Sequence, residues 1–348
     1  MQVLFRCDAS ARMGVGHLMR CLTLASALVT KGANVTFVSQ QLASGGLERI
    51  KAKGFRAKLF SDTSPDCFDE REDAVKTAEV LSEMGHVDWL IVDHYQIGEA
   101  WENVQRRYAC NIMAIDDLAN RRHNCRLLLD QNLFADASLP RYQGLVPDDC
   151  ISLLGPAYAL LREEFGVARA KYFVRERLKR LFVFFGGGDY TNETAKVIEA
   201  LMSEELCDLE ADVVIGGANP HYEEITRLCA ARKKTVLYRD VDIMAELMAA
   251  ADFCIGAGGS SVWERCCVGL PSIVVTVADN QIQPMQQLAD AGAIVLYSGE
   301  KTVVGYRDIL KDFSTGKYDW RLMSQTGRRL FDGNGAVRVA ERMTGVSE

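Results

Sequence analysis

The sequence lacks the long apolar stretches that a membrane protein needs. No hydrophobic run approaches the roughly 18 residues of a transmembrane helix. The first residues, Met1 to Phe5, enter a predicted strand without a basic region or a cleavage site. We therefore expect a cytoplasmic protein that does not bind membranes.

The sequence also has no excess of positive charge and no grouped metal ligands. Its formal net charge is −7, whereas a nucleic-acid surface needs clustered Lys and Arg, so we expect no nucleic-acid partner. The 11 Cys and 5 His are dispersed, without a CxxC pair or the spacing of a ligand set. We expect reduced cysteines, no bound metal and no cofactor.

Short apolar runs alternate with amphipathic segments, which is typical of βα units around a parallel sheet. The predicted strands are 3–6, 34–38, 89–92, 112–115, 127–129, 181–185, 211–215, 235–238, 253–255, 272–275 and 294–296. The clearest predicted helices are 17–30, 191–202, 222–232, 243–250, 261–268 and 282–291.

The pattern restarts at residue 181, after a basic stretch. This restart predicts two Rossmann-like α/β domains of similar length, facing each other across a cleft. We expect an N-terminal domain at 1–165, a linker at 166–180 and a C-terminal domain at 181–348. The last helix is expected to pack back on the N-terminal domain.

A histidine preceded by two glycines follows the first predicted strand. Gly14 and Gly16 lie in the loop that leads to His17, in the first turn of the next helix. The positive end of the helix dipole disfavours an imidazolium, so the ring is suited to act as a neutral general base. A histidine that caps or packs is the alternative, and the place of His17 at a strand end favours catalysis.

A second glycine loop leads from strand to helix in the C-terminal half. Gly258, Gly259, Ser260 and Ser261 present backbone amides and hydroxyls in the arrangement that holds a phosphate. The local sequence allows two interpretations of Glu264. It completes a capping box that begins at Ser261, or its carboxylate accepts the hydroxyls of a ribose.

Polar side chains follow two further strands. Asp93 and Tyr95 come after strand 89–92, and Asn280 and Gln281 come after strand 272–275. Such groups suit a sugar, but helix capping by Asp93, packing by Tyr95 and N-capping in the 279–281 segment are open alternatives.

The loop 258–264, with 269–271 and 279–281, resembles the UDP-binding half of MurG-type glycosyltransferases, which have the GT-B fold. The resemblance covers about residues 181–330. It implies that the glycine loop holds a diphosphate, that Glu264 binds ribose, and that the main chain of Val241 faces uracil.

With the N-terminal motifs included, nearly the whole chain is similar to the UDP-sugar hydrolases of pseudaminic-acid biosynthesis. The motifs are 6–10, 14–17, 93–95, 115–117, 130–132, 155–165 and 185–189. The resemblance implies hydrolysis of UDP-2,4-diacetamido-2,4,6-trideoxy-β-L-altropyranose at the anomeric carbon with inversion, releasing UDP and the free sugar. His17 would be the base, without a metal.

We expect His17 to be the catalytic residue, and we expect two sets of binding residues. The expected substrate-binding residues are Asp8, Gly14, Gly16, Tyr95, Asn280 and Gln281. The expected UDP-binding residues are Gly186, Gly187, Val241, Gly258, Gly259, Ser260, Ser261 and Glu264. The partner is a small-molecule UDP-sugar, and we expect a monomer or a weak homodimer. The alternatives are a glycosyltransferase, a hydrolysing 2-epimerase and a non-catalytic nucleotide-sugar-binding protein.

Overall fold

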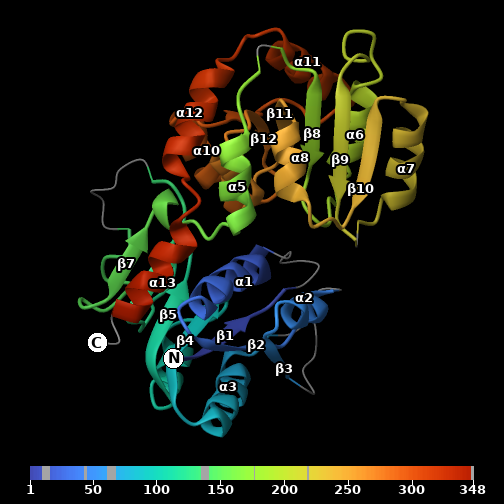
Figure 1. Cartoon of the computed structure of the whole chain (residues 1–348). Coiled ribbons are helices and arrows are strands. Elements are labelled where there is room, and N and C mark those ends of the chain that lie inside the picture. Colours follow the sequence, from blue (N-terminus) through green and yellow to red (C-terminus); the bar gives the residue numbers. More distant parts are fainter. Residues whose placement is uncertain are drawn as a thin grey trace. The chain divides into compact units, whose positions relative to one another are not determined.

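The computed structural model of the chain contains two compact units of α/β structure (Figure 1). Unit 1 is formed by Met1–Leu161 and Asn334–Glu348, and unit 2 by Arg162–Gly333. The structure describes residues 1–9, 16–42, 45–60, 68–134, 141–175, 177–217 and 219–345.

Unit 1 is built on parallel strands joined by helices. The strands are β1 (Gln2–Cys7), β2 (Asn34–Ser39), β3 (Arg56–Leu59), β4 (Val87–Asp93), β5 (Ala109–Ile115), β6 (Leu127–Asp130) and β7 (Ile151–Leu154). The helices are α1 (Gly16–Val29), α2 (Gly46–Ala52), α3 (Glu70–Met84), α4 (Glu99–Gln105), the 3-10 helix η1 (Pro156–Tyr158) and α13 (Gly335–Gly345). The sheet order is β3-β2-β1-β4-β5-β6-β7, and neighbouring strands are parallel.

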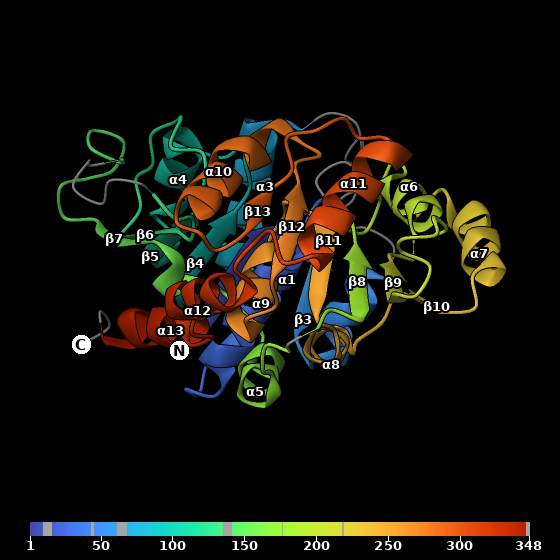
Figure 2. The same ribbon diagram turned by 90° about the horizontal axis from the view of Figure 1, so that it is seen from above.

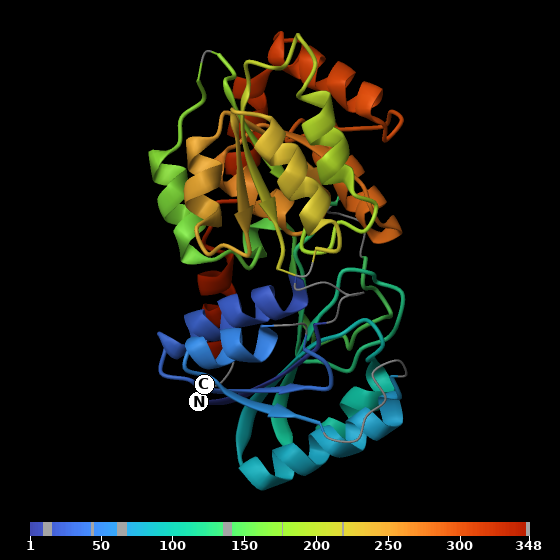
Figure 3. The same cartoon turned by 90° about the vertical axis from the view of Figure 1, so that its right-hand side faces the viewer.

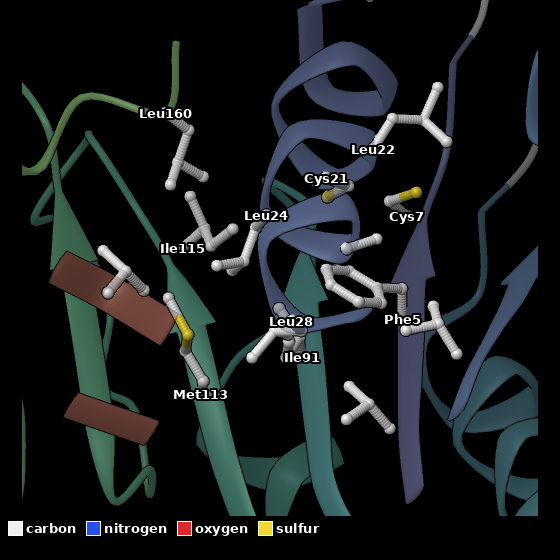
Figure 4. Packing of buried hydrophobic residues seen from close by; sticks show 14 of the residues in the cluster. Phe5, Cys7, Cys21, Leu22, Leu24, Leu28, Ile91, Met113, Ile115 and Leu160 are labelled. Carbon is white, nitrogen blue, oxygen red and sulfur yellow. The ribbon is translucent and has the colours of Figure 1, made fainter. Parts of the chain in front are cut away.

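Both faces of this sheet are covered, which explains its continuous apolar strands. Phe5 belongs to the core under α1, and the adjacent Leu4 belongs to the core under α3 and α4. Successive strand residues therefore alternate between two buried faces. In Figures 1 and 3, α1 and α2 (blue) lie on one side of the sheet and α3 (cyan) lies on the other. Figure 4 shows Leu24 and Leu28 of α1 packed over the strand residues of the first face.

Unit 2 repeats this plan. Its strands are β8 (Arg180–Phe184), β9 (Glu210–Ile215), β10 (Thr235–Arg239), β11 (Phe253–Ala257), β12 (Ser272–Val275) and β13 (Val295–Leu296). Its helices are α5 (Glu163–Lys171), α6 (Glu193–Ala200), α7 (Tyr222–Ala231), α8 (Met244–Ala250), α9 (Ser261–Val268), the 3-10 helix η2 (Asp279–Gln281), α10 (Ile282–Asp290), α11 (Val303–Ser314) and α12 (Trp320–Leu330). The order is β10-β9-β8-β11-β12-β13, again with parallel neighbours. In Figure 2, α6 and α11 lie on one side of this sheet and α5 and α8 on the other.

Every strand predicted from the sequence is present, and two edge strands were missed. β3 is mostly exposed and β7 is partly exposed. β3 (RAKL) has only two apolar residues, and β7 (ISLL), although apolar, is only four residues long, so neither gives a clear strand pattern.

The predicted linker at 166–180 is wrong in its first part. Residues 163–171 form α5, which contacts α8 and α9 of unit 2 and buries Phe165 and Ala168. The basic side chain of Arg169 donates to the carbonyl oxygens of Cys267 (3.0 Å) and Phe331 (3.2 Å). This basic side chain therefore binds backbone oxygens within the unit instead of lying in a linker between two domains.

Helix α13 packs in unit 1 against α1 and η1. Its first residue is a glycine because the backbones approach closely there. A Cβ on Gly335 would collide with the carbonyl oxygen of Ala159 and would lie 2.6 Å from the amide nitrogen of the same residue. Both neighbours are backbone atoms, so the added methyl group could fit only if η1 or α13 moved.

We expect Gly335→Ala to lower the free energy of unfolding by about 1–3 kcal/mol, measured as a reduced midpoint of urea unfolding. Gly166→Ala is the matched control, because Gly166 lies in α5 with open space around the position of a Cβ. That change should be neutral or slightly stabilising, since Ala is the better helix former. Equal midpoints for the two variants would contradict the close approach.

Candidate functional site

In each unit, the candidate residues lie where the order of the strands reverses. From β1 the chain goes to β2 and β3 on one side and then to β4 and its successors on the other. In unit 2 the corresponding reversal is between β8 and β11. Ligands of open parallel sheets bind at the carboxyl ends of the strands at this point. The pairing of Cys7 with Asp93 brings the ends of β1 and β4 side by side there.

The side chain of His17 is fixed by a buried carboxylate. His17 Nδ1 lies 2.6 Å from Oδ1 of Asp93, and the two residues are 5% and 0% exposed. Burial alone would raise the pKa of Asp93, but Arg20 and His17 hold it well below its usual value. An ionised carboxylate accepts hydrogen bonds only, so Nδ1 carries the proton. The lone pair is then on Nε2, the arrangement that a general base requires.

Arg20, one turn further along α1, completes the environment of Asp93. Its Nε donates to Asp93 Oδ2 (2.6 Å) and its Nη2 to Oδ1 (2.6 Å). Its Nη1 donates to Oδ2 of Asp117 at 3.2 Å. Tyr95 contacts the His17 ring edge-on, with 4.7 Å between ring centroids. Asp93 is therefore an ion-pair partner, and the alternative of a helix cap is wrong.

Arg20 and Asp117 were not predicted from the sequence as site residues, and Asp93 was not predicted to pair with His17. Two signals were present: Arg20 follows His17 at the i, i+3 spacing of one helix face, and both acidic residues follow predicted strands. What was missing was the adjacency of β1 and β4, which are separated along the chain by two further βα units.

Asp8 is committed to contacts within unit 1. Its Oδ1 accepts from Arg6 Nη1 (2.8 Å) and from the amides of Gln40 (2.8 Å) and Gln41 (3.1 Å). Its Oδ2 accepts from Arg6 Nη2 (3.0 Å) and lies 3.5 Å from His94 Nε2. Burial and the charge of Arg6 lower the pKa of His94 to about 4. These contacts favour a structural role for Asp8 over the substrate contact that the sequence suggested.

In unit 2, the side chains of Met285 and Gln281 pack closely against the glycine loop after β11. A Cβ on Gly258 would lie 2.8 Å from Met285 Cγ and 3.1 Å from Gln281 Oε1. Gln281 Oε1 accepts from the Val277 amide at 2.9 Å, so this side chain supports the turn, while Asn280 is exposed. Ser260 and Ser261 then lead into α9, whose first amides have no partner within the helix.

The glycines after β8 form the neighbouring loop. Gly186 has a φ of 90°, which favours glycine. A Cβ on Gly216, after β9, would collide with the carbonyl oxygen of Gly187 and would lie 2.6 Å from its Cα. The two strand ends are therefore in close backbone contact, and Asp189 binds the next helix by accepting from the amides of Glu193 and Thr194, both at 2.9 Å.

Glu264 does not form the capping box. The N-cap of α9 is Ser260 rather than Ser261, and its side chain makes no capping hydrogen bond. Glu264 Oε1 instead accepts from Arg162 Nη2 at 3.4 Å, and its side chain is 19% exposed. Burial raises the pKa of Glu264, and Arg162 opposes this effect. The Glu264 side chain is thus paired with Arg162 and is partly exposed.

The remaining predicted residues are located as follows. Gly16 is the first residue of α1, and Val241 is half-buried ahead of α8, whereas Gly14 lies outside the described residues. Within the described ranges, we find no group of three or more His, Cys, Asp or Glu that is placed to hold a metal ion. In the same ranges, no helix combines the length and apolar character needed to cross a bilayer.

Residues 181–303 match the glycosyltransferase family 28 C-terminal domain. Over 99% of both chains, the structure is similar to MurG of Acinetobacter baumannii, with a TM-score of 0.65 and 13% identity. It is also similar to the UDP-GlcNAc 2-epimerase of Neisseria meningitidis, with a TM-score of 0.65 and 12% identity over 99% of this chain and 100% of that one. The chain has the GT-B fold.

Two curated relatives show how far sequence similarity extends. The spore coat polysaccharide biosynthesis protein SpsG of Bacillus subtilis is 31% identical over 53% of this chain and 56% of its own length. A Campylobacter jejuni protein named UDP-2,4-diacetamido-2,4,6-trideoxy-beta-L-altropyranose hydrolase is 27% identical over 85% of this chain and 99% of its own length. The chain thus spans little more than half of SpsG but nearly all of the hydrolase.

We expect Asp93→Asn to destabilise the protein by about 3 kcal/mol at neutral pH, because it leaves the buried Arg20 short of a charge partner. The pKa of Asp93 is lower in the folded state, so its contribution is complete above the ordinary carboxyl pKa of about 4 and is lost as the pH falls further. Urea unfolding at a series of pH values should therefore show the two proteins converging in acid.

The control for this prediction is Asp149→Asn. The Asp149 side chain is 76% exposed and pairs with Arg126 at 3.1 Å. Exposed pairs contribute little to stability, so this variant should match the unmodified protein at every pH. If both variants unfolded at the same urea concentration, the importance of the Asp93 cluster would be refuted.

Proposed function

We propose that this protein hydrolyses a UDP-linked 2,4-diacetamido-2,4,6-trideoxyhexose of the altropyranose type, in pseudaminic-acid biosynthesis. The observation that carries the proposal is the His17–Asp93 pair, with the imidazole oriented by a buried, ionised carboxylate. Two further observations support it. One is the strand-to-helix glycine loop in unit 2, and the other is the similarity to the Campylobacter hydrolase along nearly its full length.

In the proposed reaction, Nε2 of His17 takes a proton from a water molecule as the oxygen attacks the anomeric carbon. The bond from that carbon to the diphosphate oxygen breaks, and its electrons leave with UDP. Attack from the face opposite to UDP inverts the configuration. A diphosphate leaves readily once its charge is stabilised, so one base suffices where ordinary glycosidases use two carboxyl groups.

Unit 2 supplies the groups for the leaving UDP. The amides of Gly259 and Ser260, with the positive end of α9, are the proposed diphosphate site. The amide of Gly258, which the sequence also suggested, instead donates to the carbonyl oxygen of Val275 at 3.1 Å. Glu264 accepts the ribose hydroxyls, and the main chain of Val241 faces uracil. Gly186 and Gly187 line the neighbouring strand end, and Tyr95 and Asn280 are the proposed sugar or water contacts.

The competing functions differ in what happens to the sugar. A glycosyltransferase would use the same UDP site but transfer the sugar to an acceptor, and a hydrolysing epimerase would also remove the proton at C2. A protein that only binds nucleotide sugars would need the glycine loop and Glu264. It would not need an imidazole held at 2.6 Å by a buried carboxylate, which favours an enzyme.

The direct test is proton NMR of the purified protein with UDP-diacetamido sugars and no acceptor. We expect UDP and the inverted anomer of the free sugar to form together. Absence of UDP release without an acceptor would refute the hydrolase in favour of a transferase or a binding protein. Deuterium from solvent at C2 of the product would identify an epimerase instead.

Replacing His17 by Asn or Leu should lower kcat by about 10²-fold or more, because the water loses its base. The Kd for UDP, measured by calorimetry, should stay within about twofold, since the UDP groups lie on unit 2. His86→Asn is the control, because this histidine is exposed just before β4 begins. A near-normal rate for the His17 variants would reject the base assignment.

Replacing Glu264 by Gln should weaken UDP binding by about tenfold, the loss expected for a hydrogen bond to a charged group. It should weaken binding of 2′-deoxy-UDP by less, because that ligand lacks one of the hydroxyls. Glu223→Gln, on the exposed face of α7, is the matched control. Equal effects of Glu264→Gln on both nucleotides would argue against the ribose contact.

A further inference from the structure

The contacts around His17 close into a ring of side chains. Its members are His17, Asp93, Arg20, Asp117 and Tyr95, and each contacts the next. They come from α1, from the end of β4 and from the loop after β5. The proposed chemistry uses His17, Asp93 and Tyr95, which leaves the roles of Arg20 and Asp117 to be explained.

Arg20 links the two carboxylates of the ring. It donates twice to Asp93 at 2.6 Å and once to Asp117 at 3.2 Å, and it is 8% exposed. Its Nη2 also lies 3.1 Å from Nδ1 of His17. Both atoms carry protons, so neither accepts from the other, and Asp93 is the acceptor that they share. The carboxylate of Asp93 is therefore fixed from two sides before it contacts the imidazole.

Asp117 connects this ion pair to the other side of the imidazole. Its Oδ2 accepts from Arg20 and from the Tyr95 hydroxyl, the latter at 3.4 Å. The Tyr95 ring meets the His17 ring at 84° with 4.7 Å between centroids. No described residue donates a hydrogen bond to Oδ1, the other carboxylate oxygen of Asp117, which is buried.

We propose that Arg20 and Asp117 are positioning residues, which fix the rotation of the His17 imidazole through Asp93 on one edge and through Tyr95 on the other. This inference rests on the proposed function, in which Nε2 of His17 must point at a water molecule. Displacement of a catalytic group by about 1 Å can lower a rate about 10²-fold. Contacts on two edges of the imidazole, from Asp93 and from Tyr95, restrict such a displacement of His17.

The kinetic experiment compares two variants of Asp117. Asp117→Ala removes both contacts and should lower kcat by about 10–100-fold, while the Kd for UDP stays unchanged. Asp117→Asn keeps the shape and an acceptor, so its kcat should fall less, and the Kd for UDP should again stay unchanged. Asp149→Asn, at the opposite edge of the sheet, is the control. Wild-type kcat in Asp117→Ala would overturn the proposal.

A double-mutant cycle tests whether Asp117 acts through Tyr95. Tyr95→Phe removes the hydroxyl that donates to Asp117, so the double variant with Asp117→Ala should lose less than the product of the two single losses. Strictly multiplicative losses would overturn the link through Tyr95. An equal loss of UDP affinity in each variant would indicate general damage and would also count against it.

Nitrogen-15 NMR of the His17 ring separates this inference from the proposed function, because it needs no turnover. The intact protein should show a single Nδ1–H form, and Asp117→Ala should show broadened or doubled ring signals, because the imidazole is held less firmly. If no UDP-sugar is hydrolysed but these spectra are found, the proposed function is refuted and the positioning role of Asp117 is supported. If turnover is found but the ring signals of Asp117→Ala match those of the intact protein, the positioning role is refuted and the proposed function is supported.

Discussion

The buried carboxylate of Asp93 is the group on which the candidate site depends. It has no exposure to water, so its charge is tolerated only because Arg20 and His17 both donate to it. The same contacts set the tautomer of the imidazole and hold the start of α1 against the end of β4. Stability and reactivity are therefore coupled at this residue, and a change that relaxes one affects the other.

In both units, the candidate residues lie at the same point of the fold, where the order of the strands reverses, but they are of different kinds. The reversal of strand order leaves a gap between neighbouring helices at the carboxyl edge of a parallel sheet. In unit 1 this position holds the ionisable side chains of His17 and Asp93, whereas in unit 2 it holds a loop of glycines and serines that leads into α9. The difference lies in the loop sequences rather than in the fold, which explains why structures only 12–13% identical share the architecture.

Local sequence was sufficient for the strands, for the position of His17 at a strand end and for the glycine loop of unit 2. It was insufficient wherever the answer depended on elements that are distant along the chain. The pairing of His17 with Asp93 requires β1 and β4 to be neighbours, and the contact of Glu264 depends on Arg162, 102 positions away. The partners of the basic stretch at 166–180 are also distant along the chain: Arg169 binds backbone oxygens of Cys267 and Phe331, and Arg175 pairs with Asp252.

The chain leaves unit 1 at Leu161 and returns to it at Asn334. Ala336, Val339, Ala340 and Met343 of α13 complete the apolar cluster over α1 and β1. During synthesis, all of unit 2 emerges before the last helix of unit 1. Unit 2 can therefore fold while the apolar cluster of unit 1 is still incomplete. A ribosome that stops after residue 333 would release a protein in which the core of unit 1 is uncovered.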